Sequence, residues 1–148
     1  MNRRNLTLTT ALAAIVLAFG GPSLHAGDFP KNSPAFHTSH AAAVKASKES
    51  GKPLVMIFSA SWCGPCQANK NHVYPSKEVQ PYHDKFVWAY LDADDEANVP
   101  AMRKAGVTGI PHIEILDKTQ KRLAQSIGMT TPGNFANTLS AALEKRSK

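Results

Sequence analysis

Cysteine is scarce in this chain, and so are aromatic residues and long apolar runs. The 148 residues include two cysteines and 7% aromatic residues, so there is no second cysteine pair to exchange electrons with the first. The apolar run from Ala11 to Phe19 has about nine residues, whereas a membrane-spanning helix needs roughly 20. No basic stretch is interleaved with aromatic residues, which argues against a nucleic-acid-binding surface. What is left is ordinary globular composition, with 43% hydrophobic and 19% charged residues and room for one domain.

The N-terminus has the pattern of a secretory signal peptide. Arg3 and Arg4 precede the apolar run, and a Gly/Pro/Ser break follows it. We therefore expect residues 1–26 to be removed by cleavage after Ala26, with Ser23 as a second candidate and an uncleaved membrane anchor as the alternative. Cleavage removes two arginines and no acidic residue, so the net charge falls from +6 to +4. The mature protein is predicted to be periplasmic, in an oxidising space where cysteines commonly form disulfides.

The rest of the chain alternates between helical and strand patterns. Residues 27–37 are predicted to be an extended leader, because they contain Pro30 and Pro34, and residues 38–148 are predicted to be one folded domain. The expected elements are a helix over 39–50, a strand over 53–60, a helix from 63 to about 75, a strand over 85–94, a short helix over 96–105, strands over 111–117 and 122–128, and a helix over 134–145.

Residue patterns also indicate which faces are buried. The strands at 53–60 and 85–94 are nearly all apolar, which predicts burial on both faces and places Trp88 in the core, whereas the strand at 111–117 alternates. Phe135, Leu139 and Leu143 form one apolar stripe on the last helix. The acidic run from Asp92 to Glu96 is interpreted as the entry to a helix rather than as a cation site.

Both cysteines lie in the stretch WCGPC, Trp62 to Cys66, where a buried strand passes into a helix. A thiolate at a helix N-terminus is stabilised by unpaired N–H groups, so Cys63 is predicted to be the exposed nucleophile of disulfide exchange. Cys66, one turn further on, is predicted to be the less exposed thiol that resolves a mixed disulfide on Cys63. Pro65 suits the first helical turn, where an N–H would lack a partner. A passive structural disulfide is the alternative, although so small a loop would stabilise the fold little.

Two motifs together resemble the thioredoxin superfamily. WCGPC is followed by GIP, Gly109 to Pro111, immediately before a strand, and the order of elements matches from about 39 to 143. The resemblance implies an α/β thioredoxin fold, with a central mixed sheet of about four to five strands and helices on both faces. Within the superfamily the chain is similar to the periplasmic thioredoxin-like domains of transmembrane disulfide reductases. A redox-active Cys63–Cys66 disulfide, with no further cofactor, is also implied.

The resemblance assigns supporting roles to residues near the cysteines. It implies a cis bond between Ile110 and Pro111, with the backbone beside it facing the cysteines and available to pair with an extended substrate. A proline that starts an edge strand is the alternative. Trp62 is expected to be exposed, as part of a docking surface for partner proteins. Gly64 and Pro65 between the cysteines, and Ile110 before Pro111, resemble the reducing members of the family.

Three positions depart from the family pattern. Where thioredoxins carry a buried aspartate for proton transfer to the resolving thiol, this chain has Ile57, and the lysine that partners that acid aligns with Tyr90. Asn71 stands where a proline usually kinks the helix. Proton handling is therefore expected to differ, through water or another group. Lys70 is a candidate source of positive potential beyond Cys66, with a solvated lysine as the alternative interpretation.

His112, directly after Pro111, is unusual because thioredoxins tend to have threonine there. One interpretation is a half-buried strand histidine, and a second is a residue that stabilises the Cys63 thiolate. The third is a ligand that completes a copper or zinc site with Cys63 and Cys66. The remaining histidines of the mature chain show no ligand spacing and are predicted to be surface residues: His37, His40, His72 and His83.

The sequence therefore predicts an exported thiol:disulfide oxidoreductase that reduces protein disulfides through Cys63 and Cys66. The expected partners are proteins that carry disulfides, together with a membrane or periplasmic thiol donor that restores the dithiol. The protein is expected to be a monomer that binds no nucleic acid. A second hypothesis, from another class, is a copper-handling module that uses Cys63, Cys66 and His112 and acts by binding rather than catalysis.

Overall fold

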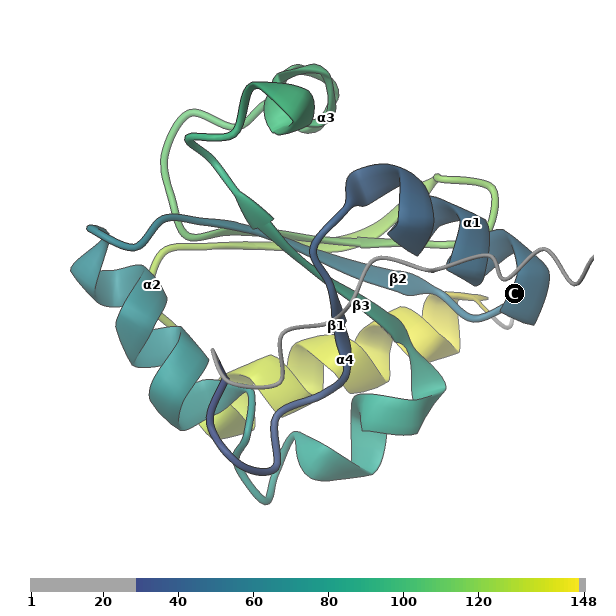
Figure 1. The fold of residues 1–148 in the computed structure, drawn as a ribbon. Coiled ribbons are helices and arrows are strands. Elements are labelled where there is room, and N and C mark those ends of the chain that lie inside the picture. Colours follow the sequence, from purple (N-terminus) through teal and green to yellow (C-terminus); the bar gives the residue numbers. More distant parts are fainter. Residues whose placement is uncertain (1–28, 147–148) are drawn as a thin grey trace, which may run out of the picture.

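The computed structural model describes residues 29–146, so the predicted signal peptide and the first two residues of the predicted leader lie outside it. Within 29–146, no helix is both long enough and apolar enough to span a membrane. The described chain forms three layers around a five-stranded sheet (Figure 1). Helices α1 (His40–Ser50) and α3 (Val99–Ala105) cover one face, and α2 (Gly64–Ala68) and α4 (Pro132–Arg146) cover the other. The predicted α/β fold with helices on both faces of a mixed sheet is confirmed.

The sheet has the strand order β1-β3-β2-β4-β5. The first three strands in this order are parallel, while β4 is antiparallel to β2 and β5 is antiparallel to β4. The bounds are β1 Phe36–His37, β2 Leu54–Ser59, β3 Val87–Asp92, β4 His112–Leu116 and β5 Arg122–Ile127. Because Phe58 pairs with His112, the end of β2 and the start of β4 lie side by side at the same end of the sheet. The cysteines follow shortly after this end of β2.

β1 lies inside the segment predicted as an extended leader. It pairs with β3, and its Phe36 is only 2% exposed and packs in the main core. Phe29 also packs against Phe36, with ring centroids 4.6 Å apart. The described part of the leader therefore contributes a fifth strand and apolar contacts to the domain.

The two faces of β2 are buried against different helices, because side chains alternate along a strand. Val55 and Ile57 belong to the larger apolar cluster, which includes Trp88 and the α4 residues Phe135 and Leu139. The neighbouring β2 residues Leu54, Met56 and Phe58 pack with alanines of α1 and α3. All six residues of β2 are buried, as the unbroken apolar run predicts.

The helices begin at polar caps that can be read in the sequence. Ser39 precedes α1 (His40–Ser50) and accepts a hydrogen bond from the Ala42 N–H, and Gly51 ends α1 with φ of 70°. A 3₁₀ turn over Glu96–Asn98 leads into α3 (Val99–Ala105). The last helix, α4, spans Pro132–Arg146 and starts two residues before the predicted position, because Thr131 caps it by accepting from the Asn134 N–H.

The helix after the cysteines changes its geometry without a proline. α2 spans Gly64–Ala68 and passes directly into a π-helical turn over Asn69–Val73. Asn71, which stands at the position of the family's kinking proline, lies inside this turn. π-helical turns of this kind are frequent at functional sites.

The expectation that β4 alternates between buried and exposed residues is wrong, because all five of its residues are buried. β4 lies between β2 and β5, and Glu114 is only 3% exposed. Its carboxylate forms an ion pair with Arg122 of β5, which also donates a hydrogen bond to the Ala105 carbonyl at 3.0 Å. Arg122 of β5 thus neutralises the Glu114 carboxylate, which the alternating pattern of the sequence alone would place in solvent.

We predict that Arg122→Ala lowers the free energy of unfolding by about 2 kcal/mol, because the buried Glu114 carboxylate loses its partner, although Arg122 itself is 47% exposed. The matched control is Lys45→Ala, which removes an exposed ion pair with Glu49 (3.8 Å; 73% and 67% exposed) and is expected to cost less than about 0.5 kcal/mol. Urea unfolding measures both values. Adding Glu114→Gln to Arg122→Ala is expected to recover part of the loss, and equal costs for the two single variants would contradict the prediction.

Candidate active site

The cysteines lie where the chain leaves β2 and enters α2. Cys63 is the N-cap of α2, with extended backbone angles, and its N–H donates to the Ala60 carbonyl at 3.2 Å. Its own carbonyl accepts from the Gln67 N–H at 3.1 Å. The predicted position at a helix N-terminus is therefore correct, with Cys63 one residue before the first helical residue, Gly64.

Cys63 and Cys66 form a disulfide, with their Cα atoms 5.2 Å apart. Cys63 is 5% exposed and Cys66 is 1% exposed, so the order of exposure is as predicted, although Cys63 is more deeply buried than expected. The N–H of Cys66 donates to Cys63 Sγ at 3.3 Å. In the reduced protein this donor favours a negative charge on Cys63 Sγ, because hydrogen bonding to a thiolate stabilises the charged form.

The Ile110–Pro111 segment lies directly against the disulfide. The Ile110 carbonyl oxygen is 3.7 Å from Cys63 Sγ, and the Ile110–Pro111 peptide bond is cis. Ile110 also packs against an apolar cluster of Ala60, Cys63 and Cys66. Two motifs that are 47 residues apart in the sequence are thus brought together at one end of the sheet.

Trp62 is 69% exposed, which confirms the predicted exposure beside the cysteines. Its indole N–H donates to Asp94 Oδ2 at 2.7 Å, so the ring is fixed although it faces solvent. Asp95 of the same acidic run caps the following 3₁₀ turn by accepting from the Ala97 N–H at 2.9 Å. The interpretation of this run as a helix entry is correct. Gly64 and Pro65 are also exposed.

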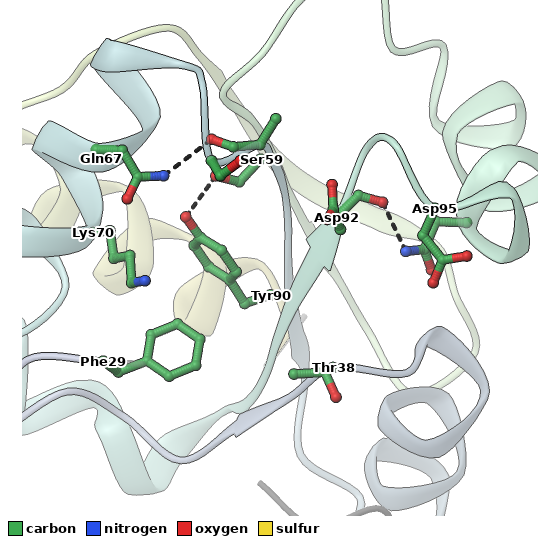
Figure 2. Close-up of a pocket in the computed structure, with 11 residues that line it drawn as sticks. Phe29, Thr38, Ser59, Gln67, Lys70, Tyr90, Asp92 and Asp95 are labelled. Carbon is green, nitrogen blue, oxygen red and sulfur yellow. Dashed lines mark hydrogen bonds between the residues drawn. The ribbon is translucent and has the colours of Figure 1, made fainter. Parts of the chain in front are cut away.

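A pocket of about 520 Å³ opens beside the motif, between α2, the ends of β2 and β3, and the N-terminal segment (Figure 2). Ser59 and Tyr90 share a hydrogen bond of 2.5 Å, and the Gln67 amide donates to the Ala60 carbonyl at 3.0 Å. The lining residues are Phe29, Thr38, Ser59, Ala60, Ser61, Gln67, Lys70, Tyr90, Asp92, Asp95 and Asn98.

Ile57 and Tyr90, which stand at the positions of the family's buried acid and its lysine, lie on neighbouring strands beside this pocket. Ile57 is fully buried, and its register partner Tyr90 turns its hydroxyl toward Ser59. Lys70 extends from the helical segment after Cys66, and its Nζ lies 4.8 Å from the Phe29 ring centroid and 5.8 Å from that of Tyr90. Lys70 is partly buried, and its alternative interpretation as a solvated lysine stays open. Burial raises the pKa of Tyr90, so its hydroxyl stays protonated at neutral pH.

His112 is fully buried rather than half-buried, and its Nε2 lies 3.1 Å from the side-chain nitrogen of Gln125. Its ring packs on Phe58, on the sheet face covered by α1 and α3, whereas α2 lies on the other face (Figure 1). Burial lowers the pKa of His112, despite the opposing effect of the nearby Glu114, so the imidazole is neutral at neutral pH. Gln125 therefore donates to Nε2.

The structure lends no support to the predicted copper or zinc site, because His112 packs with Phe58 on the sheet face away from α2. In the described part of the chain, no three or more His, Cys, Asp or Glu side chains are grouped closely enough to hold a metal ion. Of the four other histidines within residues 29–146, His72 is exposed, while the rest are partly buried: His37, His40 and His83. His83 in particular contacts the Tyr74 carbonyl at 2.9 Å and packs on Trp88.

Sequence reasoning overlooked Asn69. Its side chain is fully buried and bonds to backbone atoms of Gly128 and Thr130. A signal was present, because Asn69 follows Cys66 by three residues and precedes Val73 by four, which places it on the buried face of the helix. A polar residue at such a spacing indicates a buried hydrogen-bonding role.

The comparisons with known proteins agree with this geometry. A family model described as thioredoxin-like matches residues 35–118. The chain is 28% identical over 138 residues to the thioredoxin-like protein HCF164, chloroplastic, of Oryza sativa subsp. japonica. The matched region covers 93% of this chain and 52% of that protein. It is 27% identical over 161 residues to the thioredoxin-related protein DsbJ of Chlamydia pneumoniae, with 99% and 46% covered. The chain thus spans about half the length of these two curated relatives.

Solved structures show the same fold. An oxidoreductase named DsbH superposes with a TM-score of 0.59 at 20% identity, covering 97% of this chain and 95% of that one. A thioredoxin from Thermus thermophilus gives a TM-score of 0.66 at 19% identity, covering 73% and 86%. At these identities the likeness concerns the fold alone. The family match spans more than half of the chain and includes both cysteines and Pro111, and the protein therefore belongs to the thioredoxin-like family.

Proposed function

We propose that this protein is an exported thiol:disulfide oxidoreductase that reduces disulfides in other proteins. The observation that carries the proposal is the Cys63–Cys66 disulfide at the start of α2, with the Cys66 N–H directed at Cys63 Sγ. A relative in Synechocystis, 34% identical over 80 residues, is named a thiol:disulfide interchange protein. That match covers 54% of this chain and 43% of the relative, so it supports the type of reaction and not a particular substrate.

In the proposed reaction the Cys63 thiolate attacks one sulfur of a substrate disulfide. A mixed disulfide forms on Cys63, and the first substrate thiolate leaves and takes a proton from solvent. Cys66 then loses its proton, and its thiolate attacks Cys63 Sγ, which releases the second substrate thiol. The substrate gains two electrons and the Cys63–Cys66 disulfide is restored. A separate thiol donor must reduce it again, because the chain has no other cysteine.

The residues around the disulfide support this cycle in distinct ways. Ile110 and Pro111 form the wall beside Cys63 Sγ, where the backbone of an extended substrate is proposed to align. The exposed Trp62 ring is proposed to contact partner proteins. Gly64 and Pro65, the first two residues of α2, are exposed between the cysteines, so no bulky side chain there is proposed to block a substrate. His112, which packs on the opposite sheet face, is proposed to support β4 beside Pro111.

The roles of the two cysteines can be separated by trapping. Cys66→Ser is expected to accumulate mixed disulfides with substrate proteins, because Cys63 still attacks but nothing resolves the product. Cys63→Ser is the matched control and is expected to trap few or none. Non-reducing gels with mass spectrometry of the captured proteins measure the difference, and equal trapping by both variants would contradict the assignment.

The direction of electron flow follows from the reduction potential of the pair. A reductase is expected to have a value close to that of thioredoxin, about −270 mV, whereas a strong oxidant lies near −120 mV. Equilibration of mature protein with a glutathione or dithiol redox buffer, under anaerobic and metal-free conditions, measures it. A value near the oxidising end would overturn the proposed reductive direction while leaving the exchange chemistry intact.

Export is proposed from the N-terminal pattern of Arg3, Arg4 and the apolar run at 11–19. The proposed organisation is a signal peptide at 1–26, a leader at 27–37 and the thioredoxin-like domain at 38–148. Expression of the full chain in a Gram-negative host is expected to yield a periplasmic protein that starts at Gly27. Intact-mass analysis of the periplasmic and membrane fractions tests this, and a full-length chain in the membrane fraction would favour the uncleaved anchor.

A further inference from the structure

The buried side chain of Asn69 is hydrogen-bonded at both its nitrogen and its oxygen to a segment distant in sequence. Its Nδ2 donates to the Gly128 carbonyl at 3.3 Å, and its Oδ1 accepts from the Thr130 N–H at 3.1 Å. A buried amide is costly unless both of its ends are paired, and both bonds here are made to backbone atoms. The two atoms lie on either side of Met129, so a single amide fixes the backbone around this residue.

The Gly128–Thr130 segment is also connected to the redox site from its other side. The N–H of Gly128 donates to the Pro111 carbonyl at 2.8 Å. Pro111 follows Ile110, whose carbonyl oxygen lies 3.7 Å from Cys63 Sγ. Asn69 itself lies three residues after Cys66, and its N–H donates to the carbonyls of Pro65 and Cys66. A continuous set of contacts therefore runs from Asn69 through the Gly128–Thr130 segment to Pro111 and Ile110, and from there through the two cysteines back to Asn69.

The backbone segment that Asn69 holds carries an exposed apolar side chain, that of Met129, and Ile127 just before this segment is also exposed. Met129 is 68% exposed and Ile127 is 59% exposed, and with Trp62 they are the exposed large hydrophobic residues of the described chain. Ile127 pairs with His112, the residue after Pro111. Met129 therefore follows directly on the residue bonded to Pro111, and an exposed methionine there is suited to contact a partner, because methionine adapts to varied apolar side chains.

We propose that Asn69 is a positioning residue for substrate choice, and this inference rests on the proposed function. By fixing the backbone around Met129, it holds an apolar contact in place for extended polypeptides that carry an apolar side chain near their disulfide. A small disulfide reaches Cys63 Sγ without using this contact. Asn69 therefore raises the reactivity of polypeptide disulfides relative to small ones.

The physical reason is the cost of ordering. Without the Asn69 amide the Gly128–Thr130 segment has fewer contacts that fix it, and a bound polypeptide would have to order it at the expense of binding free energy. The same loss does not affect a substrate that contacts only the sulfur. Substrate selectivity, rather than stability, is thus the property that separates positioning from a purely structural role.

The test uses the reduced mature protein and two substrates in single-turnover reactions. One is a peptide with a disulfide flanked by leucine or phenylalanine, and the other is 2-hydroxyethyl disulfide. Asn69→Ala is expected to lower the second-order rate constant for the peptide about tenfold and that for the small disulfide less than twofold. Met129→Ser changes only an exposed side chain, and it is expected to lower the peptide rate constant in the same selective way.

Ser47→Ala is the matched control. Ser47 is another fully buried polar residue, whose Oγ donates to the Lys52 carbonyl at 2.6 Å, and it lies on α1 away from the cysteines. Its loss is expected to cost stability while leaving the ratio of the two rate constants unchanged. Equal losses for both substrates in Asn69→Ala, or a wild-type ratio in Met129→Ser, would overturn the inference. A wild-type protein that reduces neither substrate would instead overturn the proposed function.

Discussion

The backbone N–H of Cys66 lies 3.3 Å from Cys63 Sγ, and this contact depends on how the chain leaves the sheet. β2 is buried along its whole length in the middle of the sheet, so its end has a fixed position, and α2 begins only five residues after Ser59. The first turn of α2 then directs its free N–H groups at the first sulfur. Unbroken apolar burial in β2 is thus what allows a polar, reactive group to be placed at the end of the sheet.

Two of the three departures from the family pattern, at Asn71 and Tyr90, are compensated locally. A π-helical turn replaces the missing helix proline and begins at Asn69, the residue that connects the helix to the Gly128–Thr130 segment. The strand lysine is replaced by Tyr90, yet an ammonium group returns from the helix, since Lys70 lies over the Tyr90 ring. At the first position a π-helical turn changes the helix geometry in place of a proline. At the second the positive charge comes from the helix rather than from the strand.

The sequence was sufficient for those features that depend on nearby residues. Apolar runs predicted β2 and β3, caps such as Ser39 predicted helix starts, and the WCGPC and GIP motifs predicted the contact between Cys63 and Ile110. Partners distant in the sequence decided the rest. Glu114 can be buried because Arg122 of the next strand, β5, neutralises its charge. His112 can be buried because Gln125 of the same strand hydrogen-bonds to its ring. No local pattern contains those partners.

The contacts that position the cysteines do not include the bond between the sulfurs. Cys63 is anchored by its backbone bonds to Ala60 and Gln67, and Cys66 lies within α2. Asn69 connects the same helix to the segment beside Pro111. Reduction therefore breaks one covalent bond and leaves these positioning contacts available to both redox forms. For the proposed exchange cycle, a site that needs little rearrangement between its two states would lose little of its rate to reorganisation.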